Sequence, residues 1–223
     1  MKVILFGASG MVGQAVLREC LLDPQVEQVL SVVRSASGQQ HAKLREVVHS
    51  DFLDFSALEE HWRGYDACFF CLGVSSAGMS EAEYRRVSYD FTLAAAQPLS
   101  RLNPAMTFVY VSGAGTDSSE RGRTMWARVK GSTENALLRL PFKAVMFRPG
   151  GIVPMHGVRS KTRSYRVMYA LTRPLWGVMR AALPHAVSTS EEVARAMIVV
   201  ARNGAPKSIM EVRDINSVAA IKP

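Results

Sequence analysis

Three glycines near the start of the chain, Gly7, Gly10 and Gly13, have a spacing that suits the binding of a phosphate group. The first allows a tight exit from a strand, the second lets a phosphate approach the backbone, and the third lets a helix pack against the strand. Free amides at the start of that helix would face a pyrophosphate. A purely structural turn is the alternative. The spacing predicts a dinucleotide site whose contacts come from Gly7, Ser9, Gly10, Met11, Val12 and Gly13.

The end of the expected second strand indicates which dinucleotide would bind. Enzymes that use NAD place an acidic residue there, which holds the 2′-hydroxyl of the adenosine ribose. This chain has Arg34 at that place, followed by Ser35. A guanidinium binds a 2′-phosphate through two charge-assisted hydrogen bonds, so we expect NADP(H) to be favoured over NAD(H), with an ordinary surface arginine as the alternative. Asp51 and Phe52 lie where a carboxylate could accept a hydrogen bond from the adenine amino group. An aspartate that stabilises the start of a helix is an equally simple explanation.

The elements that would position these residues alternate between strand and helix. Short apolar runs predict strands at residues 3–6, 28–33, 46–49, 65–72, 106–112, 142–147 and 208–212. Helices are expected at 11–20, 56–62, 80–102, 124–140 and 189–204. Three of them begin at capping boxes, formed by Ser56 with Glu59, Ser80 with Glu83, and Thr189 with Glu192. This alternation predicts an α/β fold of the Rossmann type, with a doubly wound parallel sheet of order 3-2-1-4-5-6-7.

Four predicted loops follow the carboxyl ends of strands and should therefore line one crevice. They are residues 7–13, 72–76, 112–115 and 148–152. From the later loops we expect cofactor contacts by Leu72, Gly73, Arg148 and Pro149. The whole chain is interpreted as one NAD(P)-binding domain, residues 1–223, with residues 150–190 as a helical appendage on the substrate side of the crevice.

Several motifs spread over most of the chain resemble the short-chain dehydrogenase/reductase superfamily, in its atypical, epimerase-like NAD(P)-binding branch. They are the glycine loop, Asp51-Phe52, Cys71-Leu72-Gly73, Tyr110-Val111-Ser112-Gly113, Lys130-Gly131 and Phe147-Arg148-Pro149-Gly150. The length and the run from Lys130 to Glu134 are most similar to the small oxidoreductase-like proteins related to the Tat-interacting protein group. The resemblance implies that Ser112 binds a substrate carbonyl and that Lys130 holds the nicotinamide ribose of the cofactor.

The chain departs from that resemblance at Trp126. The family places a tyrosine four residues before the lysine, on the same helix face. An indole N–H donates a hydrogen bond but does not titrate usefully, so the ordinary acid is missing. Tyr110, Tyr165 and Tyr169 are the alternatives, although core packing explains the first and an amphipathic helix explains the other two.

Two functions therefore stay open. The first is an NADP(H)-dependent oxidoreductase or epimerase-like enzyme that acts on a small carbonyl compound, in which Ser112 orients the carbonyl and Lys130 fixes the ribose. The second is a non-catalytic NADP(H)-sensing module that regulates a protein or membrane partner, and the missing tyrosine favours it. The otherwise complete crevice loops favour the enzyme.

The composition is that of an ordinary globular protein, with 48% hydrophobic residues and a formal charge of +8. A basic stripe within residues 159–180 would lie over the crevice or, as alternatives, on an acidic membrane or at a protein interface near Trp176. No nucleic-acid motif and no metal-ligand spacing among the histidines accompany the charge. Three cysteines are too few for a secreted disulfide scaffold, and no window suits a membrane-spanning helix, so we expect a cytoplasmic protein.

Overall fold

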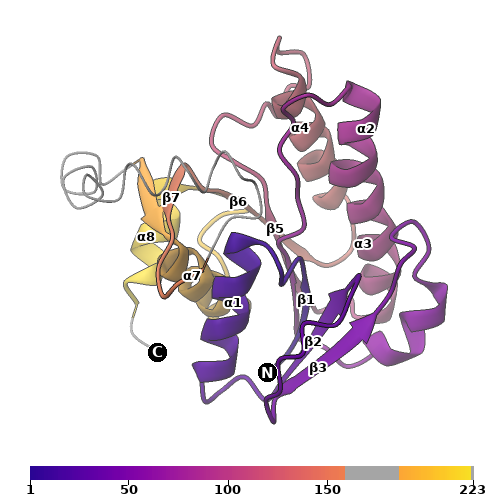
Figure 1. Cartoon of the computed structure of the whole chain (residues 1–223). Helices are drawn as coiled ribbons and strands as arrows, with labels where there is room; N and C mark the ends of the chain where they lie inside the picture. Colours follow the sequence, from indigo (N-terminus) through magenta and orange to yellow (C-terminus); the bar gives the residue numbers. More distant parts are fainter. Residues whose placement is uncertain (159–185, 222–223) are drawn as a thin grey trace.

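A parallel β-sheet of seven strands forms the centre of the molecule (Figure 1). The computed structural model describes residues 1–158 and 186–221. The strands of this sheet are β1 (Lys2–Phe6), β2 (Gln28–Val33), β3 (Leu44–Val48), β4 (Ala67–Phe70), β5 (Thr107–Val111), β6 (Lys143–Arg148) and β9 (Ile209–Glu211). Their order is β3-β2-β1-β4-β5-β6-β9, which confirms the predicted doubly wound α/β fold and its strand order.

Strand β1 lies in the middle of the sheet and is covered on both faces. Val3 and Leu5 pack into one hydrophobic cluster, whereas Ile4 and Phe6 pack into the other. Successive side chains of a strand point to opposite faces, so alternate residues of β1 pack against the helices on opposite faces of the sheet. All four side chains are 0% exposed, which explains why the strand is an unbroken apolar run.

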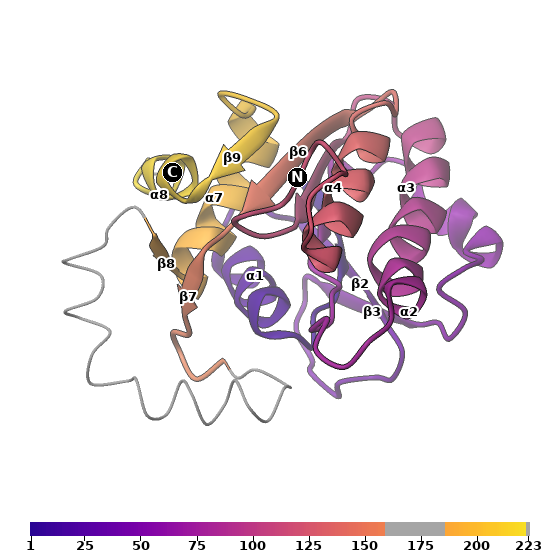
Figure 2. The ribbon, with the colours of Figure 1, turned by 90° about the horizontal axis from the view of Figure 1, so that it is seen from above.

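Helices cover the two faces of the sheet in separate layers (Figure 2). One layer consists of α1 (Met11–Leu22), α7 (Ser190–Asn203) and α8 (Val212–Ala219). The opposite layer contains a 3-10 helix, η1 (Ser56–Trp62), together with α2 (Glu81–Arg85), α3 (Phe91–Leu102) and α4 (Met125–Leu137). Between α2 and α3 the chain forms a π-helical turn, η2 (Arg86–Asp90), so these elements make one continuous helical stretch.

Two of the three predicted capping boxes are confirmed, those of Ser80 with Glu83 in α2 and Thr189 with Glu192 in α7. The third prediction, Ser56 with Glu59, is wrong. Phe55 is the N-cap of η1 and has no capping side chain, and the amide of Ser56 donates instead to the carboxylate of Asp54 at 2.8 Å. The segment forms a 3-10 helix, whose tighter turn places residues three apart in an eclipsed position.

Residues 34–43, which connect β2 to β3, contain no helix, as the sequence predicts, although a helix usually joins neighbouring parallel strands. Two other features of the fold were not expected from the sequence. A second, two-stranded parallel sheet is formed by β7 (Gly151–Val153) and β8 (Val187–Thr189). Helix α8 was also not predicted. The expected helical appendage is described only at its two ends, and its arginine stripe, Tyr165 and Tyr169 lie outside the described residues.

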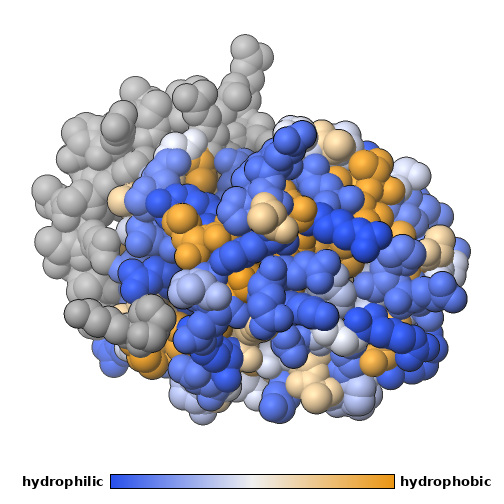
Figure 3. Space-filling model, turned by 90° about the horizontal axis from the view of Figure 1, so that it is seen from below, coloured by the Kyte–Doolittle hydropathy of each residue, from blue (hydrophilic) through white to orange (hydrophobic). Residues whose placement is uncertain are grey.

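The surface seen from below in Figure 3 is largely hydrophilic, with small separate hydrophobic areas. The most exposed large hydrophobic side chains, Leu22, Val48 and Ile221, come from α1, β3 and the segment after α8. Within residues 1–158 and 186–221, none of the helices combines the length and the apolar character that crossing a bilayer requires.

Candidate functional site

The loop after β1 approaches the end of β4 so closely that side chains are excluded. Gly7 has a φ of +81°, and a Cβ on it would lie 2.6 Å from the backbone of Cys71. A Cβ on Gly13 would lie 2.0 Å from the carbonyl oxygen of Gly7. The two glycines therefore allow the tight turn out of the strand and the close packing of α1 on the loop, as their spacing indicates.

Gly10 is open on the side where a ligand would bind. Among the described residues, a Cβ on it would meet only the Gly7 carbonyl oxygen, at 3.4 Å, which is an ordinary contact. Gly10 is the N-cap of α1, and no side chain caps this helix end. The amides of the first turn, at Met11 and Val12, can therefore donate to an anion such as a pyrophosphate.

The residues expected to bind the adenosine end lie around the end of β2. Arg34 is exposed there, immediately after the strand. Ser9 and Ser35 line one cavity with a volume of about 700 Å³, which continues along α1 to Leu21. A cavity of this size accommodates a substantial part of a nucleotide. The glycine loop and the end of β2 thus meet at one site, as the sequence predicts.

Asp51 and Phe52, in the segment between β3 and η1, have structural roles in this fold. The carboxylate of Asp51 accepts a hydrogen bond from the backbone amide of Leu53 at 2.9 Å. Phe52 is buried, and its ring packs against Phe55 and Phe91 with centroids 5.5 and 5.9 Å apart. A local turn and the aromatic core account for both side chains, and the contact of Asp51 with adenine stays a prediction.

Ser112, immediately after β5, donates its hydroxyl hydrogen to a buried carboxylate. Its Oγ lies 2.5 Å from Oε1 of Glu134 and 3.1 Å from the carbonyl oxygen of Phe147. Glu134, on α4, is 0% exposed. Because a hydroxyl has one hydrogen to donate, Ser112 in this arrangement has none for a substrate carbonyl. This bond differs from the role that the family resemblance implies for Ser112.

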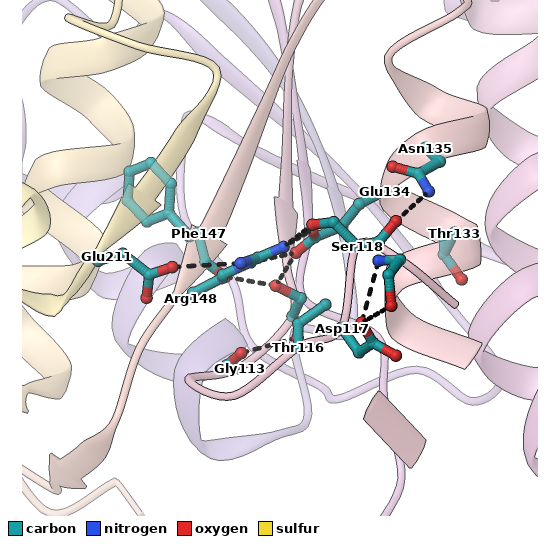
Figure 4. Close-up of polar contacts among 12 residues, drawn as sticks. Gly113, Thr116, Asp117, Ser118, Thr133, Glu134, Asn135, Phe147, Arg148 and Glu211 are labelled. Carbon is teal, nitrogen blue, oxygen red and sulfur yellow. Dashed lines mark hydrogen bonds and ion pairs between the residues drawn. The ribbon is translucent and has the colours of Figure 1, made fainter. Parts of the chain in front are cut away.

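Arg148, at the end of β6, lies between two carboxylates (Figure 4). Its Nε and Nη2 are 3.1 and 2.5 Å from the two oxygens of Glu134, and Nη1 is 3.2 Å from Glu211. Nη2 also donates to Ser118 at 2.6 Å. The hydrogen bonds with Glu134 raise the pKa of Arg148. The guanidinium thus neutralises a buried charge, and a contact of this side chain with the cofactor stays a prediction.

Backbone hydrogen bonds hold the later crevice loops together. The amide of Ser112 donates to the carbonyl of Phe147 at 2.8 Å, and the amide of Ala114 donates to the carbonyl of Pro149 at 2.8 Å. Pro149 is buried. Leu72 is partly buried and packs against the aromatic cluster. These contacts bring the loops after β5 and β6 side by side and leave Pro149 a structural role.

Lys130, on α4, is buried against β5. Its Nζ donates to the hydroxyl of Tyr110 at 2.9 Å and to the carbonyl oxygen of Val111 at 3.1 Å. A Cβ on Gly73 would lie 4.0 Å from Nζ, so the ammonium is next to the loop after β4. Burial lowers the pKa of Lys130 to about 8, and the nearby charge of Glu134 acts in the opposite direction.

Tyr110 is in turn anchored on the π-helical turn η2. The hydroxyl groups of Tyr110 and Thr92 donate to the carbonyl oxygen of Ser88, at 3.3 and 2.8 Å. The hydroxyl of Thr133 lies 3.2 Å from the same oxygen and makes its shorter bond, at 2.8 Å, to the carbonyl of Val129. These three hydroxyls come from β5, α3 and α4. One backbone carbonyl therefore fixes the position of Tyr110, and through it the position of the Lys130 ammonium.

Trp126 lies one helical turn before Lys130 and packs over the loop after β5. Cβ atoms on Gly113 and Gly115 would lie 3.8 and 3.7 Å from its indole ring, and the side chain is half-buried. The two glycines leave room for the ring. A large, non-titrating side chain thus occupies the position where the family resemblance expects a tyrosine.

Reasoning from the sequence missed Glu134, Ser118 and the bond between Lys130 and Tyr110. One signal was present, because Glu134 is the only acidic residue between Arg121 and Arg180 and follows Lys130 by one helical turn. Over the described ranges, no three metal-ligating side chains form a cluster. The site therefore consists of the glycine loop at the start of α1, the cavity lined by Ser9 and Ser35, and a buried polar cluster around Lys130 and Glu134.

This chain belongs to the NAD(P)H-binding family, whose model matches residues 7–153. The chain is also similar to two curated proteins. Protein fmp52, mitochondrial, of Emericella nidulans is 28% identical over 170 residues, which cover 73% of this chain and 70% of the relative. Protein FMP52, mitochondrial, of Eremothecium gossypii is 29% identical over 153 residues, which cover 67% of this chain and 66% of the relative.

Solved structures with a similar fold include an oxidoreductase of the short chain dehydrogenase/reductase family from Burkholderia thailandensis. It has a TM-score of 0.68 at 16% identity, over 94% of this chain and 89% of that chain. WbmF of Bordetella bronchiseptica, in complex with NAD+, has a TM-score of 0.66 at 17% identity, over 97% and 76%. UDP-glucose 4-epimerase of Thermotoga maritima has a TM-score of 0.65 at 13% identity, over 98% and 81%. At these identities the likeness shows the fold alone.

The relatives overturn one expectation. The sequence was interpreted as that of a cytoplasmic protein, whereas the FMP52 relatives are named mitochondrial. The physical reason for the error is simple. A low cysteine count and a globular composition argue against a disulfide-stabilised secreted scaffold, but they do not distinguish the cytosol from other reducing compartments.

Proposed function

We propose that the protein is an NADP(H)-dependent oxidoreductase or epimerase-like enzyme that acts on a small carbonyl compound. The observation that carries the proposal is the buried Lys130 ammonium, bound to Tyr110 and adjacent to the exposed Gly73 of a crevice loop. An amine that changes protonation near neutral pH suits proton transfer to an oxygen. Membership of the NAD(P)H-binding family supports the nicotinamide cofactor.

The residues of the amino-terminal half fit a dinucleotide. The backbone around Gly10 would hold the pyrophosphate, because a side chain there would fill the approach to the uncapped start of α1. Ser9 and Ser35 would contact the adenosine ribose from the walls of their shared cavity. When bound, a reduced nicotinamide supplies the hydride that a carbonyl reduction needs.

Arg34 supports the choice of the phosphorylated cofactor. We expect Arg34→Ala to weaken NADPH binding by about 10- to 100-fold, because a charge-assisted pair with the 2′-phosphate is lost. NADH binding should change by less than about threefold. Calorimetric titration of both cofactors measures the difference. Arg101→Ala, which removes an exposed arginine paired with Glu59, controls for the change in net charge. Equal affinities of the unmodified protein for NADPH and NADH would contradict the preference.

A second candidate function is a non-catalytic module that senses the NADP(H) state. The specific observation in its favour is that Ser112 gives its hydroxyl hydrogen to Glu134 while Trp126 occupies the usual tyrosine position. Incubation with NADPH and a panel of aldehydes, ketones and quinones separates the two functions, with loss of NADPH absorbance as the readout. Steady turnover supports the enzyme, whereas binding of NADPH without turnover supports the module.

A substitution at Trp126 tests whether the enzyme already has its acid. We expect Trp126→Tyr to change kcat by less than about tenfold relative to Trp126→Phe, because the phenol adds an acid to a site that has one. Trp126→Phe is the matched control, since both variants shorten the ring that packs on Gly113 and Gly115. Activity that arises in Trp126→Tyr and is absent from both Trp126→Phe and the unmodified protein would favour the non-catalytic module instead.

A further inference from the structure

The ammonium of Lys130 has hydrogens for three bonds, and the described structure accounts for two of them. One is donated to the Tyr110 hydroxyl and one to the Val111 carbonyl, both from β5. Among the described residues, no acceptor takes the third. The aliphatic part of the side chain is packed inside the protein, since the residue is only 6% exposed. The head group is therefore held in one orientation with a proton left over.

The ammonium of Lys130 is accessible from the side of Gly73, because glycine has no side chain to cover it. Gly73 is exposed and has no side chain, and even a Cβ there would lie 4.0 Å from Nζ. Apart from Gly73 itself and its two chain neighbours, no other atom of the described residues lies within 4 Å of that Cβ position. A ligand oxygen placed in the crevice at Gly73 would thus meet the ammonium without displacing a protein group.

The hydrogens of the other polar groups in the cluster are already donated to acceptors within the protein. The hydroxyl of Ser112 donates to Glu134, and the carboxylate of Glu134 is bound by Arg148. The hydroxyl of Tyr110 donates to the Ser88 carbonyl, and burial raises the pKa of Tyr110 well above its usual value. Trp126 does not titrate.

The charged and titratable groups around Lys130 come from four elements. Glu134 on α4 stabilises the ammonium, but the guanidinium of Arg148 from β6 compensates that carboxylate. Tyr110 from β5 contacts the ammonium directly, and Tyr84 from α2 lies close to Tyr110. Desolvation is the largest influence and lowers the pKa of Lys130 to about 8. The ammonium is then mostly protonated at neutral pH and releases its proton readily.

We propose that the ammonium of Lys130 is the group that protonates the substrate oxygen, in place of the missing tyrosine. The inference rests on the proposed function. In the step, the carbonyl carbon accepts a hydride from reduced nicotinamide, which is left oxidised, and the carbonyl π bond breaks. The oxygen takes a proton from Nζ, which gives an alcohol and a neutral amine, and the amine then regains a proton from solvent.

The ionisation and the access of Lys130 are measured first, without any turnover. Competitive acetylation with trace acetic anhydride between pH 6 and 11, followed by peptide mass spectrometry, reports the reactivity of each lysine. We expect Lys130 to be acetylated with a midpoint near 8, well below the ordinary lysine value of about 10.4. A midpoint above about 10, or a Lys130 that is not acetylated at any pH, overturns the inference whatever the activity.

Turnover of three variants then identifies the donor. We expect Lys130→Met to lower kcat by about 10²- to 10⁴-fold, and Lys130→Arg by at least about 10²-fold, because a guanidinium keeps its proton. NADPH affinity should stay within about threefold in Lys130→Arg, which separates proton transfer from cofactor binding. Tyr110→Phe should lower kcat by about tenfold or less and shift the pH profile to lower values, because a hydrogen bond to the charged form is lost.

The direction in which kcat changes with pH tests whether the protonated form of Lys130 is the active one. Reduction needs the protonated amine, so kcat of the unmodified protein should fall as the pH rises through about 8. Circular dichroism verifies that each variant is folded. If Tyr110→Phe loses as much activity as Lys130→Met, or if Lys130→Arg keeps full activity, Lys130 is not the donor. If the unmodified protein turns over no carbonyl although Lys130 titrates near 8, the proposed function fails and the transfer step fails with it.

Discussion

Glu134→Gln is expected to lower the free energy of unfolding by about 3 to 5 kcal/mol, the range for breaking a buried ion pair by removal of one partner. The carboxylate is 0% exposed and accepts hydrogen bonds from Arg148 and Ser112. Glutamine keeps the size of the side chain but turns one acceptor into a donor. Its amide hydrogens would then face the guanidinium or the serine hydroxyl, and the buried charge of Arg148 would lose its main partner.

Urea unfolding followed by circular dichroism measures this change. Glu211→Gln is the matched control, because Glu211 also pairs with Arg148 but at 3.2 Å and with a side chain that is 48% exposed. We expect that control to cost less than about 1 kcal/mol, since solvent screens the pair. The double variant Glu134→Gln with Arg148→Met should be more stable than the sum of the single effects predicts. Equal losses in Glu134→Gln and Glu211→Gln would contradict the assignment of Arg148 to the buried charge.

Gly13→Ala is the second change for which we expect a large effect. The new Cβ would lie 2.0 Å from the carbonyl oxygen of Gly7, a separation that backbone atoms must move to relieve. We expect a loss of stability of about 3 kcal/mol or more, because overpacking here displaces α1 from the loop after β1. In a chain of this length that corresponds to a fall in Tm of about 6 to 12 °C. NADPH binding should fall by at least about 100-fold, since the loop and the helix start move together.

Gly10→Ala separates binding from stability in the same loop. Its Cβ would lie 3.4 Å from the Gly7 oxygen, which is an ordinary contact, and its φ is negative. The free energy of unfolding should therefore change by less than about 1 kcal/mol. NADPH affinity should still fall by about tenfold, because the methyl group would fill the approach to the phosphate. A thermal-shift series with and without NADPH distinguishes the two variants, and similar melting temperatures for both would contradict the packing role of Gly13.

Much of the fold was predictable because its signals are local and strong. The run Val3–Phe6 followed by three spaced glycines defines a strand, a turn and a helix within one short segment. The alternation of strands and helices then determines the strand order, because parallel connections are right-handed. The β7 and β8 pair escaped detection because each strand has three residues, and its partner is distant in the chain. Short strands have no periodicity to read.

The site was less predictable, because its main contacts join residues that are far apart in the sequence. Arg148 is the last residue of a strand that leads into a crevice loop, a position that suits a cofactor contact. In the sequence, its partner Glu134 looks like an ordinary charged residue on a helix. Tyr110 has the pattern of a core strand residue and is one, but it also holds the Lys130 ammonium. Pairings of this kind depend on how α4 is rotated against β5 and β6, which periodicity indicates only coarsely.

The π-helical turn η2 adds one residue to the helical stretch formed by α2, η2 and α3. The number of residues in this stretch therefore indicates whether a relative has the same arrangement at Tyr110 and Lys130. Deleting one residue from Arg86–Asp90 would restore a regular α-helix and rotate everything before it by about 100° relative to α3. The carbonyl of Ser88, which accepts a hydrogen bond from the Tyr110 hydroxyl, would no longer point toward that hydroxyl. In an alignment of relatives, a one-residue gap at η2 would therefore separate proteins that keep the Tyr110 and Lys130 arrangement from those that lost it.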